Sequence, residues 1–460
     1  MLAVALAFVP ALVPTMSKRA SPRTASPTML EPPPKRIAVV GAGIGGLALA
    51  RALQTLDTGV EDVAVFERRD ELKPNIGGGI QINGGAAVLA RLGLGEQMKA
   101  SALPVRRILS RKSGGFELLD IDVESLVRGE PSLVDETGTP QAFSIMRDAL
   151  QRMLADSLPA GTVRLGRKVV SIDEGKDGVN LVFDDGQSER FDLIVGADGL
   201  SSRVRDHVEA SHADGEGVTP PEYSGIRVQF GVVPAGGVRP EGASGEFHQW
   251  FGEGVYALTG SYGTGAADGA TSDMVAVVFA DPAASSDAPP ENSNWDASDV
   301  REDCVGRLRR AGIPQEVVAV AEASERCFEL GVYEHSATAP WVSKSGRAVL
   351  LGDSAHAMAP FLGQGANQAI QDGYCLASCL AAARAGDLSF KLLGPLQRYT
   401  LLRRAPVTAL QIESRLLGAM ETAGGGPGTL PQAVRDAFFL TNGKLGVAAQ
   451  VFVKGARPWV

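Results

Sequence analysis

The 460-residue chain has few cysteines, no excess of basic charge and no long apolar run. Four cysteines are too few for a disulfide-bonded scaffold, and no further cysteine or histidine follows them at the spacing of metal ligands. We therefore predict no metal site and four buried thiols, Cys304, Cys327, Cys375 and Cys379. The net charge is −9 and no basic stripe is present, which argues against a nucleic-acid partner. No stretch reaches the roughly 18 apolar residues of a membrane span.

The first 34 residues differ in composition from the rest of the chain. Residues 2–13 form an apolar run of signal-peptide length, followed by Lys18 and Arg19 among small residues, with Glu31 the only acid. This pattern is similar to a signal peptide followed by a transit peptide, as in algae with complex plastids. It predicts a targeting or disordered extension over residues 1–34 and a plastid location. A mis-assigned start, with a soluble cytoplasmic protein, is the alternative.

A glycine-rich turn between a strand and a helix opens the folded part of the chain. Residues 37–40 (IAVV) form an apolar run of strand type, residues 41–46 (GAGIGG) follow at once, and residues 47–56 have a helical pattern. A second apolar run, residues 63–66, ends at the acidic Glu67. Strand, G-x-G-x-x-G, helix, strand and terminal acid together form the dinucleotide-binding fingerprint.

Each glycine of this fingerprint has a physical task. Gly41 makes the tight turn, Gly43 lets the backbone approach a pyrophosphate, and Gly46 lets the helix pack on the strand. The free N–H groups at the helix N-terminus then face the phosphates. Glu67 can accept hydrogen bonds from a ribose diol, and its negative charge disfavours a 2′-phosphate. The fingerprint therefore predicts NAD or FAD as the bound dinucleotide.

Two later segments distinguish between these dinucleotides. Residues 191–205 run from an apolar strand into Gly-Ala-Asp-Gly, with Asp198 in the turn. Residues 350–372 contain the sequence GDSAH, then Pro360 and the sequence GQG before another helical pattern. Together with the fingerprint, these segments resemble the three signature motifs of single-component FAD-dependent aromatic hydroxylases. This is the p-hydroxybenzoate-hydroxylase-like family, which also contains zeaxanthin epoxidases, and the resemblance extends over residues 36–415.

The resemblance implies an α/β fold with a Rossmann-type FAD-binding domain, a β-sheet substrate domain and C-terminal helices. The FAD-binding domain would be discontinuous, over residues 36–215 and 338–385. The substrate domain would span residues 216–337, and the helical region residues 386–460. The composition of the middle region agrees, because four stretches are rich in β-branched and aromatic residues: 223–230, 247–251, 254–258 and 274–279.

The resemblance also implies a role for individual residues in holding non-covalent FAD. Glu67 would bind the adenosine ribose, Arg147 would lie near the ribityl and pyrophosphate groups, and Asp353 would bind the ribityl chain. Asp198 would order the pyrophosphate region, and Arg68 would reach the adenine end. The full expected cofactor set is Gly41, Gly43, Gly46, Glu67, Arg68, Gly79, Arg147, Asp198, Asp353, Gly363, Gly365, Ala366 and Asn367.

The segment from residue 360 to residue 367 is expected to face the flavin ring. A helix that begins near Gly365 points unpaired N–H groups at the negative charge of reduced flavin. Pro360 stiffens the loop where substrate and oxygen would meet the flavin. Arg227, His248 and Tyr256 complete the expected catalytic set as substrate contacts, although each is equally compatible with the outer face of the sheet.

The implied activity is that of an FAD-dependent NAD(P)H monooxygenase. NADH or NADPH would reduce the flavin, O₂ would form a C4a-hydroperoxide, and its terminal oxygen would hydroxylate or epoxidise an aromatic or isoprenoid small molecule. The alternative is a flavin-dependent reductase of the geranylgeranyl-reductase kind, which inserts no oxygen. Peripheral contact with a membrane is left open.

One segment departs from the family pattern. Tyr333, Glu334 and His335 precede Trp341 where many members have Tyr-Asp-Arg. The contact that this arginine commonly makes in the flavin region is therefore not carried over to the present chain.

The first prediction concerns the state of the cofactor. Purified protein should be yellow and contain one non-covalent FAD per chain, because the fingerprint offers no His, Cys or Tyr for covalent attachment near the ring. Acid precipitation followed by absorbance spectroscopy of pellet and supernatant checks this. Flavin that stays with the pellet would contradict the prediction.

Overall fold

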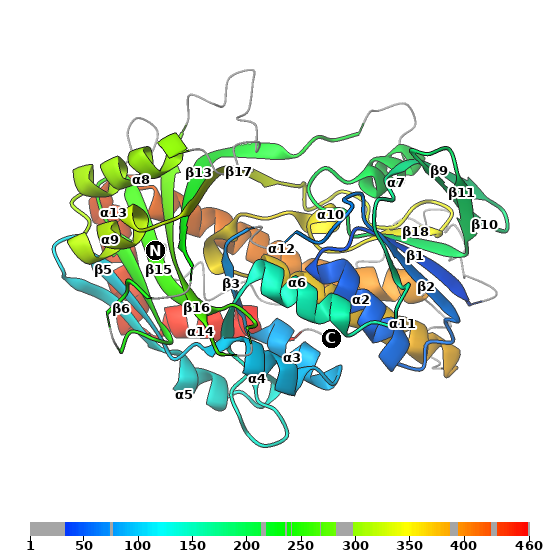
Figure 1. The fold of residues 1–460 in the computed structure, drawn as a ribbon, viewed down its shortest axis with the longest axis horizontal. Helices are drawn as coiled ribbons and strands as arrows, with labels where there is room; N and C mark the ends of the chain where they lie inside the picture. Colours follow the sequence, from blue (N-terminus) through cyan, green and yellow to red (C-terminus); the bar gives the residue numbers. More distant parts are fainter. Residues whose placement is uncertain are drawn as a thin grey trace, which may run out of the picture.

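The computed structural model arranges the chain in three sheets and the helices that cover them (Figure 1). The residues it describes are 33–73, 77–212, 218–234, 237–240, 242–266, 268–281, 298–386, 394–424 and 430–458. The predicted extension over residues 1–34 lies almost wholly outside the described residues. Within the described ranges, none of the helices is both long enough and apolar enough to cross a membrane.

A five-stranded parallel sheet forms the dinucleotide-binding half. Its spatial order is β18 (Ala348–Leu350), β12 (Leu193–Gly196), β1 (Arg36–Val40), β2 (Asp62–Phe66) and β8 (Val163–Arg164). All residues of β12 and β18, and all of β1 except Arg36, are buried, as expected for a parallel sheet covered on both faces. The Rossmann-type architecture predicted from the fingerprint is confirmed.

Two helices pack closely beside each other against this sheet (Figure 1): α2 (Ile44–Thr55) and α11 (Gly365–Arg384). Glycines lie at their contact. A Cβ atom at Gly373 would lie 2.8 Å from the Leu49 nitrogen, and one at Gly45 would lie 3.0 Å from Ala369 Cβ. This close approach fixes the position of α11, and with it the start of the helix at Gly365, relative to the dinucleotide-binding turn.

A small antiparallel sheet extends this half of the molecule (Figure 1): β9 (Val169–Gly175), β10 (Gly178–Phe183) and β11 (Ser188–Phe191). Between α2 and residue 212, the described part of the chain also forms the helices α3 (Gly84–Arg91), α4 (Gly95–Ser101), α5 (Val123–Arg128), α6 (Arg147–Asp156) and α7 (Arg203–His212). Short helical turns are η1 (Pro131–Leu133), α10 (Asp353–His356) and η3 (Pro360–Leu362).

The second half is built on a large mixed sheet. Its main path is β17 (Arg326–Glu334), β13 (Glu222–Val233), β16 (Thr271–Ala280), β15 (Val255–Gly263), β14 (Glu246–Phe251), β5 (Arg107–Lys112) and β6 (Glu117–Asp122). β3 (Gly79–Ile82), β4 (Leu103–Pro104) and β7 (Phe143–Met146) join beside β15. The four stretches predicted as strands of one sheet correspond to β13 to β16, so that prediction is confirmed. The sheet also takes strands from chain segments ahead of residue 216.

The two faces of the large sheet have different partners. One face packs against α8 (Ser298–Arg310) and α9 (Gln315–Glu322) in a compact apolar cluster. The other face looks toward the C-terminal helices α12 (Pro395–Glu421), α13 (Gln432–Lys444) and α14 (Val447–Ala456) (Figure 1). Because successive side chains of a strand alternate between faces, each strand position belongs to one of these two environments.

The four cysteines are buried free thiols, as predicted.

A buried charged cluster joins α10, α11 and α12. Asp372 accepts a hydrogen bond from Arg403 Nε at 2.7 Å on one oxygen and lies 2.6 Å from His356 Nε2 on the other. All three side chains are buried. Burial alone would raise the pKa of Asp372, but the charges of His356 and Arg403 outweigh it and lower that pKa to about 2. The backbone N–H of Gly352 also donates to Asp372, at 2.9 Å.

The second prediction follows from this cluster. Asp372→Asn leaves Arg403 buried without its counter-charge, so the free energy of unfolding should fall by about 3–5 kcal/mol. The carboxylate's pKa is lower in the folded chain than its ordinary value of 3.8, so its contribution is present above pH 3.8 and is lost as the pH falls toward about 2. Denaturant unfolding monitored by circular dichroism measures both effects.

The matched control is Asp57→Asn. Asp57 also pairs with an arginine, Arg384, at 2.7 Å, but its side chain is 84% exposed. Removing this exposed pair should cost less than about 1 kcal/mol. Equal losses in the two variants would show that the buried cluster does not hold these helices together.

Candidate active site

In the glycine-rich turn after β1, the side that faces the protein interior has no room for a side chain. Gly41 has a φ of +108°, and a Cβ there would lie 2.4 Å from the Ala197 carbonyl oxygen. A Cβ at Gly46 would lie 2.2 Å from the Gly41 oxygen. At Gly43, the N-cap of α2, the nearest atom to such a Cβ is 3.8 Å away. The turn therefore packs closely against the protein interior at Gly41 and Gly46, while the start of α2 at Gly43 has free space beside it, as a pyrophosphate site requires.

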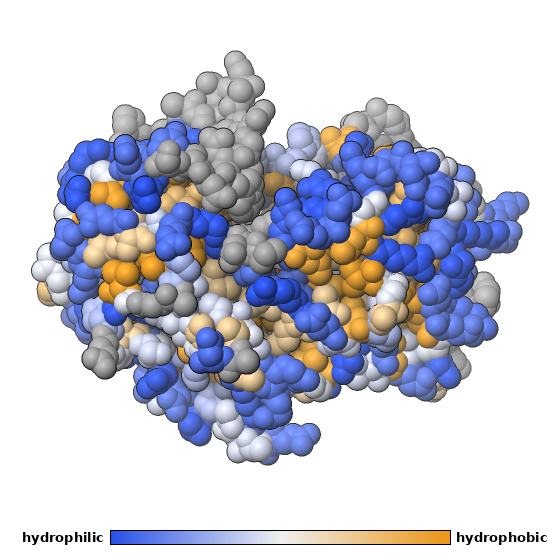
Figure 2. Space-filling view, in the orientation of Figure 1, coloured by the Kyte–Doolittle hydropathy of each residue, from blue (hydrophilic) through white to orange (hydrophobic). Residues whose placement is uncertain are grey.

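Glu67 lies at the end of β2, beside this turn. Its Oε2 accepts a hydrogen bond from the Ala42 N–H at 3.2 Å, and its Oε1 accepts one from the Arg69 N–H at 3.1 Å. These bonds hold the carboxylate at the place where the fingerprint puts a ribose. Arg68 is exposed on the loop that follows. On this face of the molecule, apolar residues reach the surface around α2 and α10, between polar rims (Figure 2).

Asp198 links the second motif to the third. Its carboxylate accepts hydrogen bonds from Ser202 Oγ at 2.5 Å and from the Arg203 N–H at 2.8 Å, so it caps the start of α7. Burial raises the pKa of Asp198. The next residue, Gly199, donates its N–H to Ser354 Oγ at 3.0 Å. The Ala-Asp-Gly turn therefore fixes the position of the residue that follows Asp353.

Arg147 and Asp353 approach the same groove from different elements. Arg147 begins α6, and its N–H donates to the Gly78 oxygen at 3.1 Å. Burial lowers the pKa of Arg147, while the carboxylates of Asp353 and Glu67 act on it in the opposite direction. A Cβ at Gly79 would lie 2.2 Å from the Tyr262 ring, so only glycine fits beneath this part of the groove. The acidic residues expected at the ribose and the ribityl chain thus share one basic neighbour.

The loop before α11 closes the groove. Pro360 begins the short turn η3, Gly363 ends it with a φ of +62°, and α11 begins at Gly365, as predicted. A Cβ built at Gly363 or Gly365 would have no atom from another part of the described chain within 4 Å. Both glycines therefore face open space. Ala366 lines the same space. The first N–H groups of α11 have no partner within the helix and point to this end.

The Asn367 side chain holds this helix start from the other side. Its Oδ1 accepts hydrogen bonds from the N–H groups of Asn83 at 2.9 Å and Gly85 at 3.0 Å, and its Nδ2 donates to the Gln81 oxygen at 3.0 Å. The side chain is completely buried. Asn367 therefore fixes α11 on α3 and β3, and only its backbone is left for the groove.

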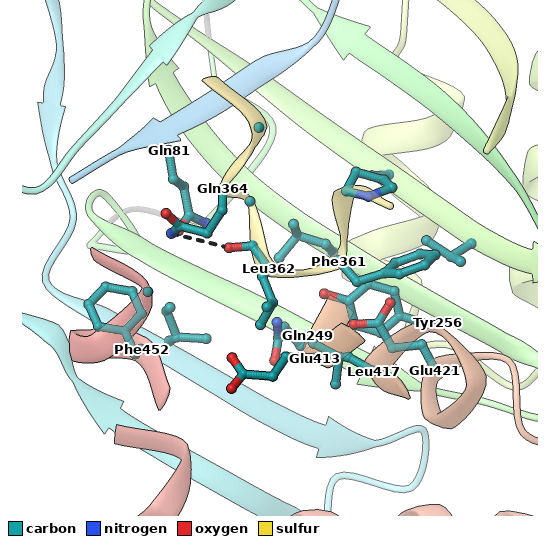
Figure 3. Close-up of a pocket in the computed structure, with 18 of the residues that line it drawn as sticks. Gln81, Gln249, Tyr256, Phe361, Leu362, Gln364, Glu413, Leu417, Glu421 and Phe452 are labelled. Atoms are coloured by element: carbon teal, nitrogen blue, oxygen red, sulfur yellow. Dashed lines mark hydrogen bonds between the residues drawn. The ribbon is translucent and has the colours of Figure 1, made fainter. Parts of the chain in front are cut away.

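A cavity of about 480 Å³ opens from this loop toward the large sheet. Its walls come from the loop itself, from one face of β13 to β16 and from α12 and α14, and most lining side chains are apolar (Figure 3). Polar groups enter at a few points, among them Gln249 and Tyr256 from the sheet and Gln364 from the loop. Gln364 donates weakly to the Leu362 oxygen, at 3.5 Å.

Strand alternation separates the three predicted substrate contacts. Tyr256 faces the cavity. Arg227 lies on the opposite face of β13 and pairs with Glu329 at 2.6 Å, and its neighbour on that face, Gln229, bonds α8. His248 likewise lies on the opposite face of β14 from Gln249 and bonds Glu246 at 3.0 Å. For Arg227 and His248 the outer-face alternative holds, and the expected substrate contact is withdrawn.

The departure at residues 333–335 has a local explanation. Glu334 forms an ion pair with Arg415 of α12, with 2.7 Å between the carboxylate and Nε. His335 is buried, and its Nε2 lies 3.0 Å from the Leu200 oxygen. Burial, with a smaller effect of the nearby Arg205, lowers the pKa of His335 to about 4. This segment therefore joins the Ala-Asp-Gly turn to α12 without a cation of its own.

The sequence did not single out the acidic residues of α12. Glu413 and Glu421 both line the cavity, from a helix that starts 35 residues after Pro360 (Figure 3). A helical spacing that includes Leu410, Glu413, Leu417 and Glu421 places them on one face, but this pattern does not say what the face packs against.

The site has the features of an FAD-binding flavoprotein with a separate substrate cavity. An open helix start follows the glycine-rich turn, an acid ends the second strand, and a second open helix start borders the cavity. The chain belongs to the FAD binding domain family, whose model matches residues 35–411. The family predicted from the three motifs is confirmed, and the protein is an FAD-dependent monooxygenase.

Named relatives match most of the chain. A 3-amino-4-hydroxybenzoate 2-monooxygenase of Streptomyces platensis is 33% identical over 92% of this chain and 97% of its own length. A 6-hydroxynicotinate 3-monooxygenase of Pseudomonas fluorescens is 28% identical over 78% of this chain and 86% of its own.

Solved structures share the fold. The HpxO protein of Klebsiella pneumoniae, complexed with FAD and uric acid, has a TM-score of 0.70 at 21% identity, covering 91% of this chain and 97% of that one. A salicylate hydroxylase substrate complex has a TM-score of 0.68 at 24% identity, covering 93% and 98%.

The residues present fit FAD, and each has a distinct task. Bound FAD, reduced by NAD(P)H, supplies the electrons that let O₂ deliver one oxygen atom to a substrate. The starts of α2 and α11 would supply N–H groups, the first for the pyrophosphate and the second for the pyrimidine end of the ring. Glu67 and Asp353 would accept hydrogen bonds from the hydroxyl groups of the ribose and the ribityl chain. The apolar walls of the cavity exclude water from the reacting groups.

The third prediction is that Asp353→Ala weakens FAD binding while the fold survives. A hydrogen bond to a charged group contributes about 1.5–3 kcal/mol, so the Kd for FAD should rise roughly ten- to hundredfold. Fluorescence titration of the stripped protein with FAD measures this. Asp353→Asn, which keeps an acceptor oxygen, should lose less. Wild-type FAD affinity with a native circular-dichroism spectrum in Asp353→Ala would remove Asp353 from the site.

Proposed function

We propose that the protein hydroxylates an electron-rich aromatic ring, with NADH or NADPH as the electron donor and O₂ as the source of oxygen. One observation carries this proposal. The apolar cavity is bounded on one side by the loop and helix start that fit the flavin ring, and on the other by a sheet face that bears Tyr256 and Gln249. A flat ring can lie between them with its substituents bonded to the sheet.

The polar groups of this wall are connected to one another. Ser110 Oγ donates to Gln249 Oε1 at 2.5 Å, and the Gln249 side chain bonds the Tyr256 hydroxyl. Burial raises the pKa of Tyr256 well above its ordinary value. A neutral phenol held in this way can bond a ring hydroxyl and turn the carbon beside it toward the flavin. Phenol hydroxyls also donate electrons into the ring, which favours oxygen transfer to that carbon.

The names of the relatives support an aromatic substrate over an isoprenoid one. The relatives reported above are named for hydroxybenzoate and hydroxynicotinate substrates. We therefore place hydroxylation ahead of epoxidation for this chain.

The fourth prediction tests this function with a panel of phenols and aminophenols. At least one should increase NAD(P)H oxidation, consume O₂ and yield a product heavier by one oxygen atom in mass spectrometry. Tyr256→Phe should raise the KM for that substrate about three- to tenfold, because one hydrogen bond of roughly 0.5–1.5 kcal/mol is lost.

His248→Asn is the matched control, since His248 occupies the adjacent strand β14 but its opposite face. It should leave KM unchanged. Equal effects of the two substitutions would contradict the assignment of the sheet faces, and failure of every aromatic compound to stimulate NAD(P)H oxidation would contradict the proposed function.

A further inference from the structure

One acidic side chain in the cavity, Glu421, takes no part in holding FAD or in the hydrogen bonds of Tyr256 and Gln249. Glu421 is the last residue of α12, and its side chain is 1% exposed. It lines the cavity together with Tyr256 (Figure 3). Within the described part of the chain, its Oε2 is buried and has no hydrogen-bond partner. A buried carboxyl oxygen without a partner costs free energy, so packing alone does not explain its presence.

The comparison with Glu413 shows that the lack of a partner is specific to Glu421. Glu413 lies on the same helix and lines the same cavity, but Lys454 of α14 is 3.4 Å from its Oε1. Burial raises the pKa of both carboxyls, and in Glu413 the charge of Lys454 acts against this effect. For Glu421 burial is the cause, and its pKa lies well above the ordinary value. Glu421 therefore brings a buried carboxyl oxygen without a hydrogen-bond partner into the cavity.

The surroundings of Glu421 decide which ligand it can take. Its carboxyl lies close enough to the Tyr256 hydroxyl to raise the pKa of that phenol further. Among the described residues that line the cavity there is no lysine, arginine or histidine. A substrate carboxylate at this end would therefore be buried among apolar side chains without a counter-charge, which costs free energy. A nitrogen bearing hydrogen, by contrast, donates to the free oxygen directly.

We propose that Glu421 is a specificity-determining residue that binds an amino or ring N–H group of the aromatic substrate, at an end of the ring that carries no carboxylate. This inference rests on the proposed function, since it assumes an aromatic ring in the cavity. It agrees in part with the relative named for 3-amino-4-hydroxybenzoate, whose substrate carries an amino group. It differs in the carboxylate, for which the described lining of this cavity has no counter-charge.

The test uses three probes that differ in one substituent: 3-aminophenol, phenol and 3-hydroxybenzoate. Their Kd values follow from the change in flavin absorbance on binding, which needs no turnover. The wild-type protein with bound FAD should bind 3-aminophenol best and 3-hydroxybenzoate worst. In Glu421→Met, which keeps the length of the side chain but no polar oxygen, the preference for 3-aminophenol over phenol should fall about two- to tenfold, as expected for the loss of one uncharged hydrogen bond. Glu421→Gln keeps one acceptor oxygen and should retain part of the preference.

Two further measurements separate specificity from a structural role. Because the wild-type carboxyl is buried without a partner, Glu421→Met should unfold at the same temperature as the wild type or a higher one. Glu413→Gln removes a carboxylate from the same helix and cavity, but one paired with Lys454, so it should leave the preference among the three probes unchanged.

The outcomes are distinct. Hydroxylation of phenols with a wild-type preference for 3-hydroxybenzoate, or with the same preference for 3-aminophenol in wild type and Glu421→Met, would overturn the role of Glu421 and leave the proposed function intact. A lower unfolding temperature of Glu421→Met with unchanged probe affinities would make Glu421 a structural residue. Absence of any aromatic-dependent NAD(P)H oxidation would instead overturn the proposed function.

Discussion

The rest of the site depends on where α11 begins. The helix starts at Gly365, with open space on the side of the cavity, and it is held at that position from two other sides. Asn367 bonds it to α3 and β3, and Asp372 bonds it to Arg403 of α12. A helix N-terminus contributes at most about 2 kcal/mol to a partly buried negative charge, and only if the charge lies within the first turn. The buried bonds behind the helix keep it at that distance.

Charge is distributed unevenly along the site, and this follows from what each part has to hold. The dinucleotide groove combines acids, which would accept hydrogen bonds from sugar hydroxyls, with Arg147 and two helix N-termini, which would face phosphate and flavin. The cavity beyond it is apolar, and the ionisable side chains that reach it from α12 are acids. An electron-rich aromatic ring with hydrogen-bond donors suits such walls better than an anion does.

The fold and the cofactor groove could be predicted from the sequence because their signals are local. Gly41 has a positive φ, and a Cβ at Gly46 would overlap the Gly41 oxygen of the same turn, so the turn itself requires glycine at both positions. The face of a strand that looks inward has no such signal. Tyr256, Arg227 and His248 looked equivalent in the sequence, because alternation separates the two faces without saying which one α8 and α9 cover. Glu421 left no signal either, since its importance comes from the cavity around it and from the lack of a partner there.

The most direct test of oxygen insertion is an isotope measurement. The protein with bound FAD is incubated with NAD(P)H and an accepted aromatic substrate under ¹⁸O₂, in unlabelled water, and the product is analysed by mass spectrometry. One ¹⁸O atom per product molecule is expected, with none when the label is in the water. Label from water, or product formed at full yield by pre-reduced protein without oxygen, would contradict the monooxygenase assignment.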